Sequence, residues 1–199
     1  MIKSLLLSFK KIGLGLALLV AMLVMVENAL GATYTSVATG NWNADATWSG
    51  TGTPGAGDIV NIASGHTITV TTNAACTSIT FTGTSGALAV NSGITLTVSG
   101  AVIRNSLTTG NTASTISGAG ILSCGSLTVG SGGGSSSNRT TTLTSTIASL
   151  NVSNQITLNS SYVTRRNNST LTHTSGTITT DGITTITPAG TTSTYSMGN

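Results

Sequence analysis

VNIASGHTITV (residues 60–70) and LAVNSGITLTV (residues 88–98) share one pattern at a constant offset of 28 residues. In both stretches Val, Ile or Leu alternates with small polar residues, and a Ser-Gly pair separates two short runs. Alternation with a period of two is typical of β-strands, and self-similarity at such an offset is typical of stacked structural units. The sequence therefore predicts strands that repeat from coil to coil, with Val60 equivalent to Leu88.

A second set of matches gives the length of the predicted coil. The apolar centres of five short motifs are spaced by 28, 20, 23 and 21 residues, and they are Ile79, Leu107, Leu127, Leu150 and Leu171. A mean of about 23 residues lies within the range for one coil of a β-solenoid. The predicted fold is an all-β, right-handed parallel β-helix, with an ordinary β-sandwich as the alternative. We expect the first four of these side chains to stack in one inward column.

The N-terminal residues have the order of a secretory signal peptide. Lysines at positions 3, 10 and 11 precede an apolar run over residues 12–26, and small residues follow. This order of basic, apolar and small residues is typical of export signals, and the apolar run is shorter than the roughly 20 residues of a spanning helix. We expect residues 1–32 to be a signal peptide, residues 33–57 an N-terminal cap, and residues 58–199 solenoid repeats that continue in a longer protein.

The charge of the mature chain excludes one class of partner. All three lysines lie in the predicted signal peptide, and the remainder carries four arginines against three aspartates. Nucleic-acid binding needs clustered Lys and Arg side chains that neutralise phosphates. We therefore expect no nucleic-acid partner, and no membrane contact after the signal peptide is removed.

The beginning of the predicted solenoid resembles a known group of proteins. The run GNWNADATW at residues 40–48, followed by PGAGD at 54–58 and GHTITV at 65–70, resembles the opening of secreted surface β-helix proteins of Bacteroidota-type bacteria. It is also similar to the G8 domain, a β module of extracellular proteins. The resemblance covers residues 40–100. It implies a β-helix of short strands, as found in adhesins or carbohydrate-active enzymes, and a secreted or bacterial cell-surface location.

Ionisable residues that could perform catalysis are few and scattered. Asp45, Asp58 and Asp181 are the only carboxylate side chains after the predicted cleavage site, and His66 and His173 are the only histidines. Polysaccharide-cleaving sites need paired carboxylates, and metal sites need clustered ligands. We therefore expect no catalytic residues, no metal and no cofactor, and predict that the chain is not an enzyme. Asp58 follows a Gly at a turn, so it is either a turn cap or part of a ligand site.

Trp42 and Trp48 are the only tryptophans, and they stand six residues apart just before the first predicted coil. One interpretation is a cap, because the end of a solenoid exposes core residues and strand edges that need covering. The other interpretation is a platform on which sugar rings stack.

The two cysteines, Cys76 and Cys124, are expected to be free although the predicted compartment permits disulfides. Each stands three residues before an apolar centre, as does Arg104 in the coil between them. Two coil spacings would separate the Cα atoms by about 9.6 Å, whereas a disulfide needs about 4.4–6.8 Å.

Three functions remain compatible with these residues. The first is a secreted or cell-surface structural and adhesive module, with extracellular polysaccharides or surface glycans as partners. The second is the non-catalytic N-terminal part of a carbohydrate-active enzyme. The third is an ice-binding solenoid, because Thr67–Thr69 and Thr95–Thr97 are predicted to project paired hydroxyls at equivalent places of two coils.

Overall fold

The computed structural model of the 199-residue chain describes residues 31–107, 110–130, 138–162, 166–186 and 192–197. Residues 32–199 form one compact unit, and the account below concerns this unit alone. The predicted signal peptide lies almost entirely outside the described residues, so it stays a prediction. Among the described residues, no helix is both long and apolar enough to cross a membrane.

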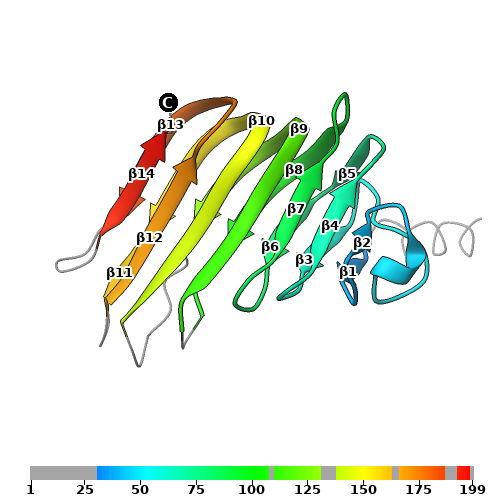
Figure 1. The fold of residues 1–199 in the computed structure, drawn as a ribbon, viewed down its shortest axis with the longest axis horizontal. Helices are drawn as coiled ribbons and strands as arrows, with labels where there is room; N and C mark the ends of the chain where they lie inside the picture. The colour runs from blue at the N-terminus through cyan, green and yellow to red at the C-terminus, as the bar shows by residue number, and fades with distance from the viewer. Residues whose placement is uncertain (1–30, 108–109, 131–137, 163–165, 187–191, 198–199) are drawn as a thin grey trace, which may run out of the picture. The chain divides into compact units, whose positions relative to one another are not determined.

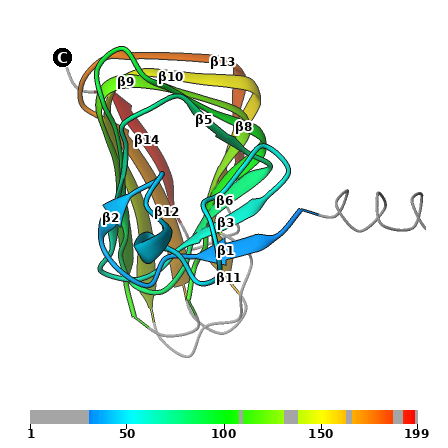
Figure 2. The same cartoon turned by 90° about the vertical axis from the view of Figure 1, so that its right-hand side faces the viewer.

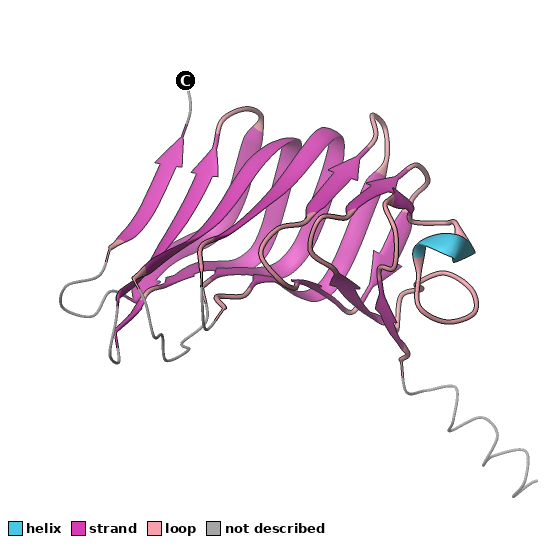
Figure 3. Ribbon diagram, turned by 60° about the horizontal axis from the view of Figure 1, so that its bottom comes forward, coloured by secondary structure: helices cyan, strands magenta, loops and turns pink. Residues whose placement is uncertain are grey.

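The unit consists almost wholly of parallel strands that lie side by side (Figures 1 and 3). A single 3-10 helix, Asp45–Thr47, lies among the described residues near the start. Among the strands that the structure describes, β11 alone pairs in the antiparallel sense, with β12, and an isolated antiparallel bridge joins Ser36 to Trp48. The strands are β1 (Thr33–Thr35), β2 (Gly40–Asn41), β3 (Ile59–Ile62), β4 (Thr67–Val70), β5 (Ala74–Cys76), β6 (Ser78–Phe81), β7 (Ala87–Val90), β8 (Thr95–Arg104), β9 (Thr112–Val129), β10 (Arg139–Asn159), β11 (Ser161–Tyr162), β12 (Arg166–His173), β13 (Thr177–Ile186) and β14 (Ser193–Met197).

The pairing of these strands generates three faces around a common core (Figure 2). Face A consists of β1, β3, β6 and residues 101–104, 126–129, 155–159 and 182–186. Face B consists of β2, β4, β7, residues 112–118, residues 139–147, β12 and β14. Face C consists of β5 and residues 95–98, 121–124, 149–152 and 177–180. The long strands β8, β9, β10 and β13 therefore run around corners.

An inward column on face A shows how the sequence specifies this winding. Each member pairs with the next, at spacings of 19, 23, 25 and 29 residues, and the members are Val60, Ile79, Val102, Leu127 and Ile156. All five side chains are fully buried. Side chains alternate between the two surfaces of a strand, so every second residue enters the core. The structure is a parallel β-solenoid of about five turns, which confirms the predicted solenoid over the β-sandwich.

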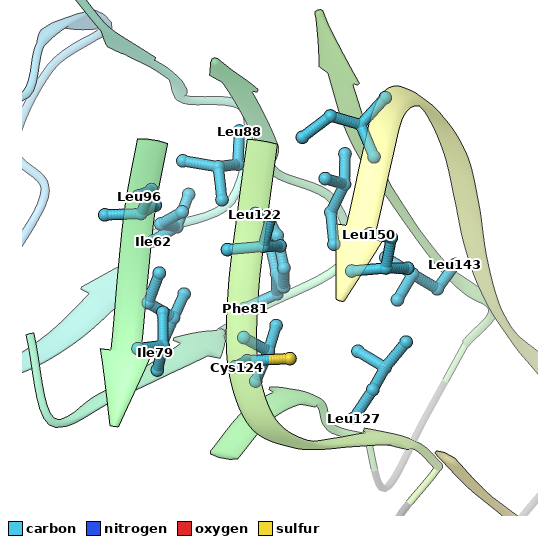
Figure 4. Close-up of a cluster of buried hydrophobic side chains, with 14 of the residues drawn as sticks. Ile62, Ile79, Phe81, Leu88, Leu96, Leu122, Cys124, Leu127, Leu143 and Leu150 are labelled. Atoms are coloured by element: carbon cyan, nitrogen blue, oxygen red, sulfur yellow. The ribbon is translucent and has the colours of Figure 1, made fainter. Parts of the chain in front are cut away.

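The core joins the three faces. Leu88 of face B, Leu96 and Leu122 of face C and Leu127 of face A all lie in it (Figure 4). The predicted cap segment also takes part in the winding, because β1 pairs with β3 and β2 pairs with β4.

The predicted column of four residues was right for Ile79 and Leu127, which lie two coils apart in the inward column of face A, and wrong for the other two members. Leu107 lies after the end of β8 and is only half-buried. Leu150 pairs with Leu122 on face C instead of stacking on Leu127. The partner of Leu88 is Ile68, so its predicted equivalence with Val60 was also wrong. The reason is physical: all three faces use the same alternation of aliphatic and small polar residues. A strand of one face therefore matches a strand of another face as well as it matches its true neighbour.

Glycine allows the chain to turn a corner inside β9. Gly118 has φ +108°, and a Cβ atom there would collide with the carbonyl oxygen of Val90 in the coil before. Only glycine combines this backbone conformation with so close an approach. A Cβ atom at Gly120, two residues later, would likewise collide with the carbonyl oxygen of Asn91.

Two aliphatic residues of β9 test the inward and outward assignment. Leu127 is fully buried, whereas Ile121 is 38% exposed on the outer surface of face C. We predict that Leu127→Ala lowers the free energy of unfolding by about 2–5 kcal/mol, because it leaves a cavity in the core. Ile121→Ala is the matched control and should cost less than about 1 kcal/mol. Urea unfolding followed by circular dichroism measures both, and equal losses would contradict the register.

Candidate functional site

Trp42, Trp48 and Tyr34 form an aromatic cluster at the N-terminal end of the solenoid. Both tryptophans are only 3% exposed. Their ring centroids are 5.4 Å apart with an interplanar angle of 74°, and Tyr34 lies edge-on to Trp48 at 6.4 Å. Edge-to-face contacts of this kind add to the stabilisation that the burial of the rings provides.

The indole N–H groups of both tryptophans are also occupied. Trp48 Nε1 donates to the backbone oxygen of Trp42 at 2.8 Å, and Trp42 Nε1 donates to the oxygen of Pro54 at 3.2 Å. These bonds fix the loop of residues 42–54 across the end of the core. The geometry favours the cap interpretation, because a stacking platform needs an exposed ring face.

Asp58 closes the turn that leads into β3. Its Oδ1 accepts a hydrogen bond from the backbone N–H of Ala32 at 2.7 Å, and its Oδ2 accepts one from Gly55 at 2.7 Å. Asp45 likewise accepts a hydrogen bond from the backbone N–H of Gly52. Two of the three carboxylates therefore hold cap loops in place, which is the role that Asp commonly has in turns.

The histidines lie in different coils. His66 is half-buried, with its Nδ1 atom 2.9 Å from the hydroxyl oxygen of Ser36. His173 is buried on the inner side of face B and pairs with Ser145. Among the described residues there is no group of three His, Cys, Asp or Glu side chains that could hold a metal ion.

Arg104 lies in the core, which the sequence did not indicate. Its side chain is fully buried on face A between Phe81 and Val129. Nη1 donates to the oxygen of Phe81 at 2.8 Å and Nη2 to the oxygen of Gly83 at 2.7 Å. Burial lowers the pKa of Arg104 to about 10, because desolvation penalises the charged form. The side chain connects two successive coils.

Cys76 and Cys124 are both buried and free. They occupy one inward column of face C, where Val98 stands between them, so they are two coils apart. The assignment of Arg104 to the intervening position was wrong, because Arg104 belongs to face A. Burial raises the pKa of both thiols to about 12, and the charge of Asp58 contributes at Cys76.

The outer surface of face B carries a pattern of hydroxyls that was not assigned from the sequence. Thr residues alternate with core residues along β10 and β12, and the pairing aligns them from coil to coil. The alternating Thr residues are visible in the sequence, but placing them on one face required the register of the strands. Thr67 and Thr69 lie on face B, whereas Thr95 and Thr97 lie on face C. The prediction that these two pairs occupy equivalent places was therefore wrong.

The chain matches no family model, no curated protein and no solved structure.

The cap interpretation makes a spectroscopic prediction. We expect tryptophan emission at short wavelength, resistant to quenching by acrylamide and unchanged by added oligosaccharides, because both rings are buried. Trp48→Phe keeps an aromatic ring but removes the donor to Trp42 and part of the buried ring surface, so it should destabilise the protein by at least about 1–3 kcal/mol. An emission shift on addition of a sugar, lost in Trp48→Phe, would instead establish a sugar platform.

Thiol chemistry tests the column of face C. At pH 8 the two cysteines of the folded protein should react very slowly with a thiol reagent, because a raised pKa leaves little thiolate and burial blocks access. Unfolding in denaturant without reductant should expose two reactive thiols. A mass two hydrogens lighter, with no reactive thiol, would show that a disulfide joins Cys76 and Cys124.

Proposed function

We propose that this chain is a structural and adhesive β-solenoid module of a secreted or cell-surface protein, and that its partners are neutral extracellular polysaccharides or surface glycans. The observation that supports this proposal most strongly is the low charge of the described outer surface. The resemblance of residues 40–100 to secreted surface proteins agrees with it.

Few of the charged groups of the described unit face solvent. Arg104 is fully buried and Arg139 is 3% exposed. Asp58 is half-buried and its Oδ2 atom accepts a hydrogen bond from the backbone N–H of Gly55, so among the described carboxylates Asp45 and Asp181 are the exposed ones. The outward positions carry mainly Thr, Ser and Asn side chains, which are donors and acceptors of neutral hydrogen bonds. Such a surface suits an uncharged partner rich in hydroxyl groups.

The proposed role is non-catalytic. Asp45 and Asp58 lie in the N-terminal cap, whereas Asp181 lies in β13, and two of the three hold cap loops. The non-catalytic part of a carbohydrate-active enzyme is the second candidate. It uses the same neutral surface to hold a polysaccharide near a catalytic domain elsewhere.

Binding to insoluble neutral and acidic polysaccharides, with a glycan array in parallel, tests this proposal. We expect retention on neutral polysaccharide that persists at high salt, because screening weakens only charge-based contacts. The matched control is Asp181→Asn, which removes an exposed charge and should leave retention unchanged. Loss of retention in high salt, retention on acidic polymers alone, or release of soluble sugar that Asp58→Asn abolishes would contradict the proposal.

A further inference from the structure

Seven hydroxyl-bearing side chains form a two-dimensional array on the outer surface of face B. One column is Thr115, Thr144, Thr172 and Ser196, and the adjacent column is Thr142, Thr170 and Thr194. We call these seven residues the hydroxyl array. Their side chains are half-buried or exposed, whereas the residues between them along each strand point into the core.

Backbone pairing sets the spacing of this array. Neighbouring strands are about 4.8 Å apart, and residues i and i+2 of one strand are about 6.7 Å apart. Adjacent hydroxyls lie close enough to interact: Ser196 Oγ donates to Thr172 Oγ1 at 3.3 Å. Thr is β-branched and stiff at χ1, so few side-chain conformations are lost when the array meets a partner. The array is thus a preorganised grid of donors and acceptors.

The other two faces lack such a grid. On face A, Ile103 interrupts the column that contains Thr80 and Thr128, and Gln155 stands in the adjacent column. On face C, Ile121 interrupts the column of Thr95, Ser149 and Thr177, and Asn151 interrupts the column of Thr97, Ser123 and Thr179. The N-terminal part of face B carries Ala87 and Ala89 at outward positions. Paired columns of hydroxyls are therefore confined to the C-terminal half of face B.

We infer that the hydroxyl array binds ice. Ice is an uncharged, periodic lattice of oxygen atoms that donate and accept hydrogen bonds, and a periodic, uncharged grid of hydroxyls complements such a lattice over its whole area. A single polysaccharide chain fits less well, because sites for small ligands are concave and depend on aromatic and apolar contacts. No outward position of face B within the described part of β10, β12 and β14 carries an aromatic side chain. The inference goes beyond the proposed function, because it names a different partner for this face and stands on the hydroxyl array alone.

Partitioning into slowly growing ice tests the inference, with thermal hysteresis measured on the same samples. The full chain should be enriched in the ice fraction relative to a co-dissolved protein that does not bind ice. Thr144→Tyr places a large side chain at the centre of the array and should reduce enrichment at least tenfold. Thr157→Tyr makes the same change on face A, between Thr128 and Thr184, and should retain full enrichment.

A conservative variant separates binding from folding. Thr172→Val keeps the shape and the strand preference but removes one hydroxyl, so it should weaken enrichment while the melting temperature stays unchanged. Exclusion of the wild-type chain from ice overturns the inference, and so does equal enrichment of Thr144→Tyr and Thr157→Tyr. Retention on polysaccharide without enrichment in ice overturns this inference and leaves the proposed function standing. Enrichment in ice without retention on any glycan supports this inference and overturns the proposed function.

Discussion

The parallel hydrogen-bonded pairing of each coil with the next is the constraint on which the rest of the structure depends. It places equivalent residues about 4.8 Å apart, so a side chain in one coil always contacts its equivalents in the neighbouring coils. Inside, this produces continuous aliphatic columns such as the one through Val102 and Leu127. Outside, it turns any residue that recurs at equivalent positions into a row. The same constraint therefore determines both the core and the pattern of the surface.

Polar residues inside the solenoid are accommodated where they bridge coils. Arg104 donates to two carbonyl oxygens of the preceding coil, so the cost of burying a guanidinium is partly offset by charge-assisted hydrogen bonds. Ser169 instead stabilises the corner between β10 and β12: its hydroxyl donates to the oxygen of Asn159 at 2.8 Å, and its backbone N–H donates to the hydroxyl oxygen of Ser160. At the N-terminal end the Trp pair covers the core, and the strands left as edges of the three faces are the short strands β1, β2 and β5. Short edges give other chains little backbone with which to pair.

The sequence was sufficient to predict the solenoid but not its register. Alternation in segments such as residues 94–98 gives strands directly, because burial on one surface requires a period of two. Assigning each strand to a face requires more, since the faces share one composition and the coils differ in length by up to ten residues. The cysteines illustrate what could and could not be predicted. Their separation by two coils was predicted correctly, but the residue between Cys76 and Cys124 is Val98 and not Arg104. The buried Arg104 was not predictable, because its partners are backbone carbonyls that leave no signal in the sequence.

Folding alone does not account for the repetition of hydroxyls on face B. Outward positions elsewhere in this solenoid hold Ile103, Ile121, Asn151 and Gln155, so the fold accepts aliphatic and amide side chains there. The strand preference of Thr is shared by Val and Ile, and therefore does not explain why Thr recurs in two adjacent columns. Ala87 and Ala113 end the two columns towards the N-terminus, so the hydroxyls recur over successive coils of the C-terminal half only. A residue that the fold does not require, repeated over successive coils of one face, is the pattern expected when a surface must match a periodic partner.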